Sequence, residues 1–283
     1  MKVPKRLEPL LQDGLIDEVL GQLMSGKESE VFLVRCGRET RCAKVYKDIQ
    51  HRSFHKQTQY TEGRKVRSSR RSRAMEKHSK FGRKEQEDVW QNAEGDALRS
   101  LAAAGVRVPA TYDFSEGVLI MELVVDGDGA VAPRLNDLRL SETLAREYYY
   151  LLIDQVVLML CAGLIHGDLS EFNVLVDDYG PVIIDLPQAV DASANNHAQS
   201  MLQRDVANMA HYYGQFAPEL LDTQYAKEIW ALYEDGELKP DTVLTGRIDT
   251  TDGESDVDGV LAEIKAVLFE EQKRQERLAQ TDE

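Results

Sequence analysis

Short segments rich in apolar residues, separated by polar or glycine-containing turns, occur in the first 125 positions of the chain and predict β-strands. Five segments have this pattern, over residues 16–23, 30–35, 40–46, 111–114 and 117–125. Between the third and the fourth, over residues 86–104, apolar side chains recur with the period of a helix. This order predicts a small lobe with an antiparallel sheet and one main helix inserted after the third strand.

The pattern becomes mainly helical after residue 126. The longest helix is predicted over residues 141–162, which carry a long apolar face and begin with a serine suited to helix capping. Further helices are predicted over residues 196–213 and 218–233. Residues 174–176 and 182–184 are short apolar segments on either side of the turn sequence Asp-Asp-Tyr-Gly, and they predict a β-hairpin.

These patterns predict a bilobal α+β protein built from four parts. In chain order the parts are an N-terminal helical extension, an N-lobe, a C-lobe, and an acidic linker that leads into an amphipathic C-terminal helix. Their predicted bounds are residues 1–15, 16–125, 126–235 and 236–283. A chain of 283 residues is long enough for two lobes that share a cleft.

Charge is distributed unevenly along the chain. The whole chain has a net charge of −15, yet residues 51–84 contain 12 lysines and arginines against two acids and carry +10, which leaves −25 for the rest. The same segment is rich in serine and threonine and has no apolar period, so it is predicted to be a flexible insertion in the N-lobe.

The composition favours a cytoplasmic protein that does not enter a membrane. The longest apolar stretch, residues 151–165, is interrupted by polar residues, so it predicts a buried helix rather than a membrane span. The three cysteines form neither a metal-binding spacing nor an even set for disulfides, which favours a reducing compartment.

The main candidate for chemistry is the segment His166-Gly167-Asp168-Leu-Ser-Glu-Phe-Asn173, followed by Val-Ile-Ile-Asp185. Phosphoryl transfer needs a carboxylate that orients the attacking hydroxyl, and oxygen ligands that hold Mg²⁺ against the phosphates. Asp168 precedes Asn173 by five residues, and Asp185 follows the predicted hairpin, as the corresponding groups do in kinases. A chance His-Asp pair beside a structural asparagine would explain neither the hairpin nor the downstream aspartate.

The N-lobe must then supply the nucleotide contacts. Residues 21–29 nearly match a P-loop, but Glu28 stands where a hydroxyl should bind Mg²⁺ and a strand follows instead of a helix, so a P-loop is excluded. As a turn between two strands, Ser25-Gly26-Lys27 can still cover phosphates with backbone N–H groups and a hydroxyl.

Lys44 lies in the middle of an apolar strand, where a buried ammonium needs a carboxylate to offset its desolvation. Glu94, on the apolar face of the inserted helix, is the predicted partner, and the pair would hold the α- and β-phosphates of a nucleotide. Met121-Glu122-Leu123 ends the last strand of the lobe, where backbone groups could bind the edge of adenine.

Together, these segments resemble the RIO family of atypical serine/threonine protein kinases, and its type-one branch most closely, over about residues 7–233. One specific mark is Ser25-Gly26-Lys27-Glu28 in place of a glycine-rich loop. Others are the His-x-Asp-Leu-Ser-Glu-Phe-Asn motif, Ile-Ile-Asp185 without a following Phe-Gly, and the long insertion before Trp90.

The resemblance implies a trimmed protein-kinase-like fold that uses ATP with Mg²⁺ or Mn²⁺. It implies transfer of the γ-phosphate to serine or threonine hydroxyls of proteins, including the protein's own. Asp168 would be the catalytic base, Asn173 and Asp185 would hold the metal, and Lys44 would contact the phosphates. Candidate autophosphorylation sites lie in the basic insertion, at Ser68, Ser69 and Ser72.

Two departures from related kinases limit these expectations. The residues after Asp185, Leu-Pro-Gln, lack a flexible activation segment, so regulation by phosphorylation of such a segment is not expected. No room exists before Ile16 for a winged-helix domain, so a DNA-binding domain is not expected and the type-two branch is disfavoured.

Two other functions remain open from the sequence. One is a RIO-type ATPase switch in ribosome or RNA biology, in which the basic insertion contacts the phosphate backbone of RNA. The other is a small-molecule kinase of the aminoglycoside or choline type, which shares the His-x-Asp-x-x-x-x-Asn pattern. The protein substrate is not specified by any motif in the chain.

Overall fold

The computed structural model describes residues 3–47 and 93–247. The chain divides into two compact units, Met1–Arg247 and Ile248–Glu283, and all described residues belong to the first. The basic insertion with its three candidate serines, the start of the helix predicted over 86–104 and the predicted C-terminal helix lie outside the described residues. None of the described helices is both long and apolar enough to cross a membrane.

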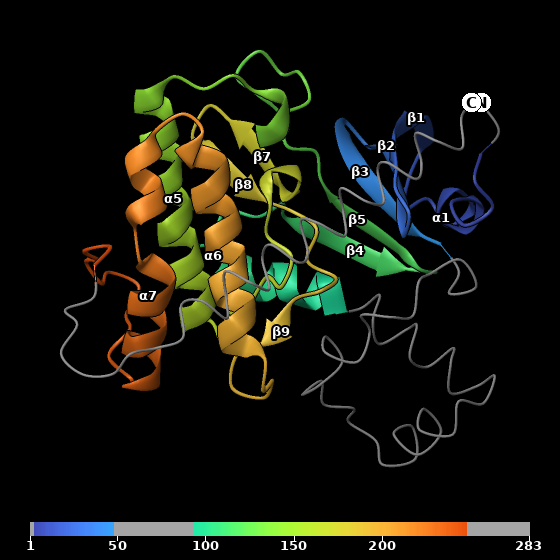
Figure 1. Ribbon diagram of the computed structural model, residues 1–283. Coiled ribbons are helices and arrows are strands. Elements are labelled where there is room, and N and C mark those ends of the chain that lie inside the picture. Colours follow the sequence, from blue (N-terminus) through green and yellow to red (C-terminus); the bar gives the residue numbers. More distant parts are fainter. Residues whose placement is uncertain (1–2, 48–92, 248–283) are drawn as a thin grey trace, which may run out of the picture. The chain divides into compact units, whose positions relative to one another are not determined.

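The N-lobe contains a five-stranded antiparallel sheet in the order β1-β2-β3-β5-β4, seen at the right of Figure 1. All five predicted strands are present, as β1 Glu18–Ser25, β2 Ser29–Cys36, β3 Glu39–Tyr46, β4 Thr111–Ser115 and β5 Val118–Glu122. The central strand β3 pairs on both sides, and Lys44 lies opposite Val31 of β2 and Leu119 of β5. This double pairing fixes the position of Lys44 within the sheet.

Alternation along β3 gives the two faces of the sheet different roles. Ala43 and Val45 are buried in a cluster with Leu7 and Leu10, so the N-terminal segment packs on one face. The short helix α1, Glu8–Gln12, forms the middle of that segment. Cys42, Lys44 and Tyr46 therefore point to the opposite face, toward the helix over 93–103 and the C-lobe.

The C-lobe is mainly helical, with α5 Glu142–Cys161 and α6 Ala198–Gly214 side by side in Figure 1. The hydroxyl of Ser141 accepts a hydrogen bond from the backbone N–H of Leu144 and caps α5, as its sequence suggested. The predicted hairpin is present as β7 Val174–Asp177 and β8 Gly180–Ile183. One hydrophobic core continues from the helix over 93–103 into α5 and α6, so the two lobes share apolar contacts.

The prediction of one continuous helix over residues 218–233 is wrong, because the segment is interrupted. A 3₁₀ turn, η5 Pro218–Asp222, is followed by extended Thr223 and then by α7, Tyr225–Glu234. The Thr223 hydroxyl donates to the carbonyl of Leu220 at 2.8 Å and also lies 2.8 Å from the hydroxyl of Tyr149. A side chain that bonds to a nearby carbonyl offers the backbone an alternative to the helical pattern.

The segment after α7 is also more ordered than a linker. The carboxylate of Glu228 accepts hydrogen bonds from the backbone N–H groups of Thr245 and Gly246, each at 2.7 Å. Leu238 and Leu244 pack against the main hydrophobic core. Residues 236–247 therefore belong to the compact C-lobe, whose boundary was predicted at residue 235.

Candidate active site

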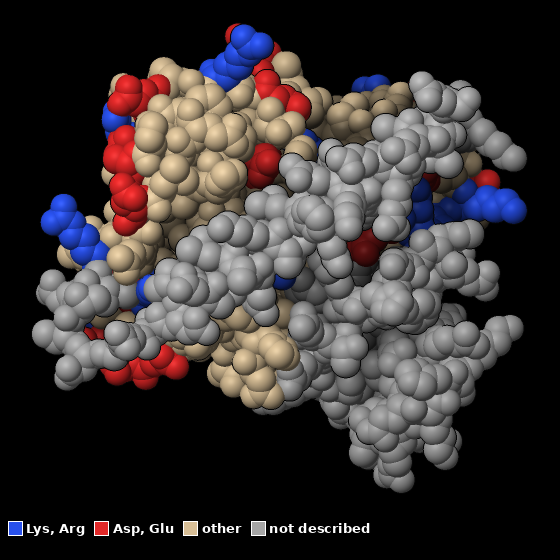
Figure 2. Space-filling view, in the orientation of Figure 1, with Lys and Arg blue, Asp and Glu red and all other residues tan. Residues whose placement is uncertain are grey.

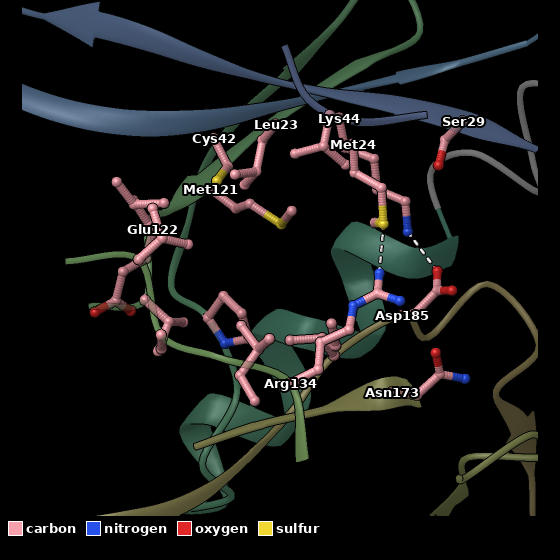
Figure 3. A pocket seen from close by; sticks show the side chains of 18 of the residues that line it. Leu23, Met24, Ser29, Cys42, Lys44, Met121, Glu122, Arg134, Asn173 and Asp185 are labelled. Atoms are coloured by element: carbon pink, nitrogen blue, oxygen red, sulfur yellow. Dashed lines mark hydrogen bonds and ion pairs between the residues drawn. The ribbon is translucent and has the colours of Figure 1, made fainter. Parts of the chain in front are cut away.

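The two lobes enclose a cavity of about 280 Å³. Its N-lobe side is lined by residues of β1, β2, β3 and β5, and its C-lobe side by residues between 131 and 137 and between 173 and 185 (Figure 3). The walls near Met121 and Leu123 are mainly apolar, whereas Lys44, Asn173 and Asp185 gather at one end. The cavity thus has an apolar part suited to a flat ring and a charged part suited to phosphates.

Lys44 is the centre of a buried ionic group. Its ammonium lies 2.7 Å from Oε1 of Glu94 and 2.6 Å from Oδ1 of Asp185, so the pairing expected with Glu94 is present. The side chain of Glu94 is only 1% exposed, and its other oxygen accepts a hydrogen bond from the hydroxyl of Tyr46. Burial disfavours the charged ammonium, but the charges and hydrogen bonds of Asp185 and Glu94 outweigh it and raise the pKa of Lys44.

Asp185 adopts a backbone conformation that is uncommon for its residue type, with φ of +66°. Burial alone would disfavour its charged form, but the neighbouring Lys44 ammonium holds the pKa of Asp185 below its usual value. The preceding residue, Ile184, donates its N–H to the carbonyl of Asn173 at 3.0 Å. Strained conformations of this kind cluster at functional sites, where the surroundings hold them in place.

The catalytic-loop candidates lie next to this group. The 3₁₀ turn η4, Glu171–Asn173, places Asn173 at the cavity, where its Nδ2 donates to the carbonyl of Asp168 at 2.9 Å. The side-chain oxygen of Asn173 is therefore the atom left for a ligand. Asp168 does not line the cavity, and its carboxylate accepts a hydrogen bond from Nε2 of Gln188 at 3.1 Å.

His166 connects the catalytic loop to the segment before Asp185. Its Nδ1 accepts the N–H of Asp168 at 3.2 Å, so its Nε2 is the nitrogen that donates to the carbonyl of Ile184 at 3.0 Å. Burial lowers the pKa of His166. A neutral imidazole in this position holds the two segments at a fixed distance.

Only some of the residues predicted to contact the nucleotide line the cavity. Met121, Glu122 and Leu123 line the cavity, and β5 ends at Glu122, so the backbone of Leu123 lies beyond the strand pairing. Ser25, Gly26 and Lys27 do not line it. Their turn is closed by the Gly26 N–H, which donates to the carbonyl of Ser29 at 2.8 Å, and the cavity meets Leu23 and Met24 instead.

Residues of α6 support the catalytic loop, and sequence reasoning missed them. The carboxylate of Asp205 is buried and accepts the N–H groups of Gly167 at 2.7 Å and Leu169 at 3.1 Å, while Arg204 donates to the carbonyl of Gly167. Asp205 occurs within the apolar stripe of its helix, beside Met201, Leu202, Val206 and Met209. An acid in such a stripe is the sequence signal that could have identified it.

Burial is the main reason that the pKa of Asp205 is raised to about 7, although Arg204 and the two N–H groups act in the opposite direction. Between the usual 3.8 and about 7, the unfolded chain has released a proton that the folded protein still holds, so raising the pH favours unfolding. We expect the free energy of unfolding to fall across this window by up to about 1.4 kcal/mol per pH unit. Asp205→Asn should flatten this dependence in urea denaturation between pH 5 and 7, and equal slopes in both proteins would contradict the prediction.

The charged end of the cavity fits a metal ion that arrives with a nucleotide. Within residues 3–47 and 93–247, no group of three or more His, Cys, Asp or Glu side chains could hold a metal by itself. Asn173 and Asp185 supply two oxygen donors on the same side of the cavity (Figure 3). Mg²⁺ is commonly bound by one or two side-chain oxygens together with substrate phosphates and water, so this donor set suits it.

A two-lobed fold with a buried Lys–Glu pair and an Asp–Asn–Asp set beside one cavity defines a protein of the kinase-like class. The family model for the RIO domain matches residues 30–226, and the chain belongs to the RIO family. This confirms the family predicted from the sequence.

Curated relatives carry the same family name. The chain is 33% identical over 207 residues to the RIO-type serine/threonine-protein kinase Rio1 of Haloferax volcanii, covering 72% of this chain and 66% of the relative. It is 31% identical over 206 residues to the human serine/threonine-protein kinase RIO1, covering 72% of this chain and 34% of that protein. The match thus spans just under two thirds of the first relative and about a third of the second.

Solved structures confirm the predicted fold. The Rio2 kinase–ADP/Mg²⁺–phosphoaspartate complex from Chaetomium thermophilum aligns with a TM-score of 0.56 at 20% identity and covers 85% of this chain and 73% of that one. At this identity the likeness concerns the fold alone.

Proposed function

We propose that this chain is an ATP-dependent serine/threonine protein kinase that transfers the γ-phosphate to protein hydroxyls, its own included. The observation that carries the proposal is the buried Lys44, held by Glu94 and Asp185 at the charged end of a cavity with an apolar opposite end. Both curated relatives described above are named serine/threonine-protein kinases, which supports the same activity here.

Each part of the site has a role in this proposal. The apolar walls beside Met121 and Leu123 take the adenine, and Glu122 and Leu123 offer backbone groups to its edge. Lys44 contacts the phosphates, and Glu94 holds Lys44 in place. The turn Ser25-Gly26-Lys27 remains a candidate cover for the phosphates, although its residues lie outside the cavity lining.

The reacting groups lie at the other end of the phosphate chain. Asn173 and Asp185 would hold Mg²⁺ or Mn²⁺, which when bound neutralises charge on the phosphates. Asp168 would accept the proton of the attacking serine or threonine hydroxyl. The amide of Gln188 donates a hydrogen bond to one oxygen of Asp168 and so helps to orient the carboxylate.

Incubation with γ-labelled ATP and Mg²⁺ tests the proposal. The transition state of phosphoryl transfer is loose, so the base contributes near the lower end of its usual range, and we expect Asp168→Asn to reduce label incorporation by about 10²-fold. ATP binding should be retained. Asp222→Asn, at an exposed position on η5, is the matched control with unchanged activity. Equal incorporation by wild type and Asp168→Asn would contradict the assignment.

The ATPase switch remains the second candidate because of one observation. The similar Chaetomium thermophilum structure is described as a phosphoaspartate complex of Rio2 kinase, in which a carboxylate carries the phosphate. A label on serine or threonine is stable to hydroxylamine, whereas an acyl phosphate on aspartate is released by it. Release of most of the label would favour the ATPase switch over the protein kinase.

The face of the helical lobe drawn in Figure 2 does not favour direct RNA binding. Figure 2 shows acidic side chains along the outer side of the helical lobe, which would repel a phosphate backbone. The basic segment over 51–84 lies outside the described residues. A small-molecule kinase, the remaining alternative, would be supported by phosphorylation of aminoglycosides or choline in the same assay.

A further inference from the structure

The cavity contains a second cation that no kinase motif of the sequence indicated. Four carboxylates line it, and among the described residues only Lys44 and Arg134 bring positive charge to its lining. Lys44 extends from the N-lobe sheet, whereas Arg134 comes from the C-lobe side and points into the cavity in Figure 3. The two cations therefore approach the same space from opposite lobes.

The two cations differ in what already neutralises them. Lys44 is bonded to two carboxylates, those of Glu94 and Asp185. The side-chain contact of Arg134 is with the sulfur of Met24, and no carboxylate in the described residues lies within ion-pair distance of it. A guanidinium has five N–H donors, and a thioether is only a weak acceptor. Most of the hydrogen-bonding capacity of the Arg134 guanidinium therefore remains for a ligand.

The backbone that carries Arg134 is anchored to the strand that follows the catalytic loop. Pro133, directly before it, accepts the N–H of Val176 at 2.9 Å, and Arg134 itself forms a β-bridge with Leu175. On its other side, the carbonyl of buried Leu135 accepts the hydroxyl of Tyr212 at 2.6 Å. The position of Arg134 is thus set by tertiary contacts on both sides.

Arg134 also lies on the charged side of the cavity. Its charge is among those that act on the carboxylate of Asp185, after the stronger effects of burial, Lys44 and His166. A half-buried guanidinium without a carboxylate is costly unless an anion is present. Its planar donors suit two phosphate oxygens at once, which a single ammonium cannot match.

We propose that Arg134 is a specificity-determining residue that binds the phosphates of the nucleotide from the C-lobe side, opposite Lys44. The inference rests on the proposed use of ATP and deepens it. Two of the four carboxylates already neutralise Lys44. Arg134 therefore supplies the additional positive charge that a polyphosphate needs in this cavity. The cavity then favours nucleoside triphosphates over nucleosides through a group outside the catalytic loop.

Direct binding of ATP and of adenosine, measured by titration calorimetry in Mg²⁺ buffer, tests the inference. Arg134→Met keeps the length of the side chain and removes its charge, and we expect about 10- to 100-fold weaker ATP binding. Adenosine affinity should not change. Arg139→Met removes the same charge from an exposed neighbouring position outside the cavity lining, and it should bind both ligands as wild type does.

Each other result overturns the inference in a recognisable way. Equal ATP affinity in wild type and Arg134→Met would show that the guanidinium does not contact the phosphates. Equal weakening for ATP and adenosine would show that Arg134 only maintains the shape of the cavity with Met24. Wild-type protein that binds neither ligand would overturn the proposed function as well.

Discussion

Replacing Glu94 by alanine is expected to lower the free energy of unfolding by about 3–5 kcal/mol. The carboxylate is almost fully buried and accepts hydrogen bonds from the ammonium of Lys44, the hydroxyl of Tyr46 and the N–H of Leu186. Alanine leaves these donors without their common acceptor, and the side chain of Lys44, only 7% exposed, keeps a single carboxylate partner, Asp185. Removing one partner of a buried ion pair lowers the stability of a protein far more than removing one partner of an exposed ion pair.

Chemical denaturation of two control variants separates this effect from a general loss of charge. Glu94→Gln keeps the volume and one acceptor oxygen, so its loss of stability should be smaller. Glu18→Ala removes an exposed carboxylate 3.2 Å from Arg35 and should change the unfolding free energy by no more than about 1 kcal/mol. A Glu94→Ala protein as stable as Glu18→Ala would contradict the structural role assigned to the buried group.

Local patterns predicted most of the fold because they depend on near neighbours in the sequence. The apolar residues on both sides of Lys44 predicted a buried strand, and the structure places that strand, β3, between β2 and β5. The helical period around residue 94 then left Glu94 as the acid on the facing helix. The pairing itself, at 2.7 Å, joins residues 50 positions apart, and the Lys–Glu pair known from kinases is what indicated it.

The residues that sequence reasoning missed act across long distances in the chain. Asp205 holds the backbone of residues 167 and 169 from a helix that begins about 30 residues later, and no spacing rule connects them. Arg134 enters the cavity because its segment bonds to β7 and to Tyr212, which only the tertiary structure reveals. The interruption at Thr223 likewise depends on a side-chain hydrogen bond, in which the Thr223 hydroxyl donates to the carbonyl of Leu220.

Asp185→Asn is expected to reduce phosphoryl transfer by about 10³-fold, because it would remove the charged group proposed to hold the metal, and it takes a charge away from Lys44. Asparagine suits this position better than alanine, since it tolerates the positive φ of +66° and adds little backbone strain. The side chain of Asp185 is 46% exposed and Lys44 keeps Glu94, so the variant should lose much less stability than Glu94→Ala.

The dependence of the rate on Mg²⁺ or Mn²⁺ concentration distinguishes the two effects of Asp185. A lost metal ligand raises the metal concentration needed for half-maximal rate, so high metal should recover part of the activity. If the carboxylate served only to hold Lys44, the rate would be low at every metal concentration, and the metal assignment would be wrong. Asp178→Asn, in the turn between β7 and β8 and outside the cavity lining, should leave the metal dependence unchanged. The rate and the metal requirement must therefore change together in Asp185→Asn if Asp185 binds the metal.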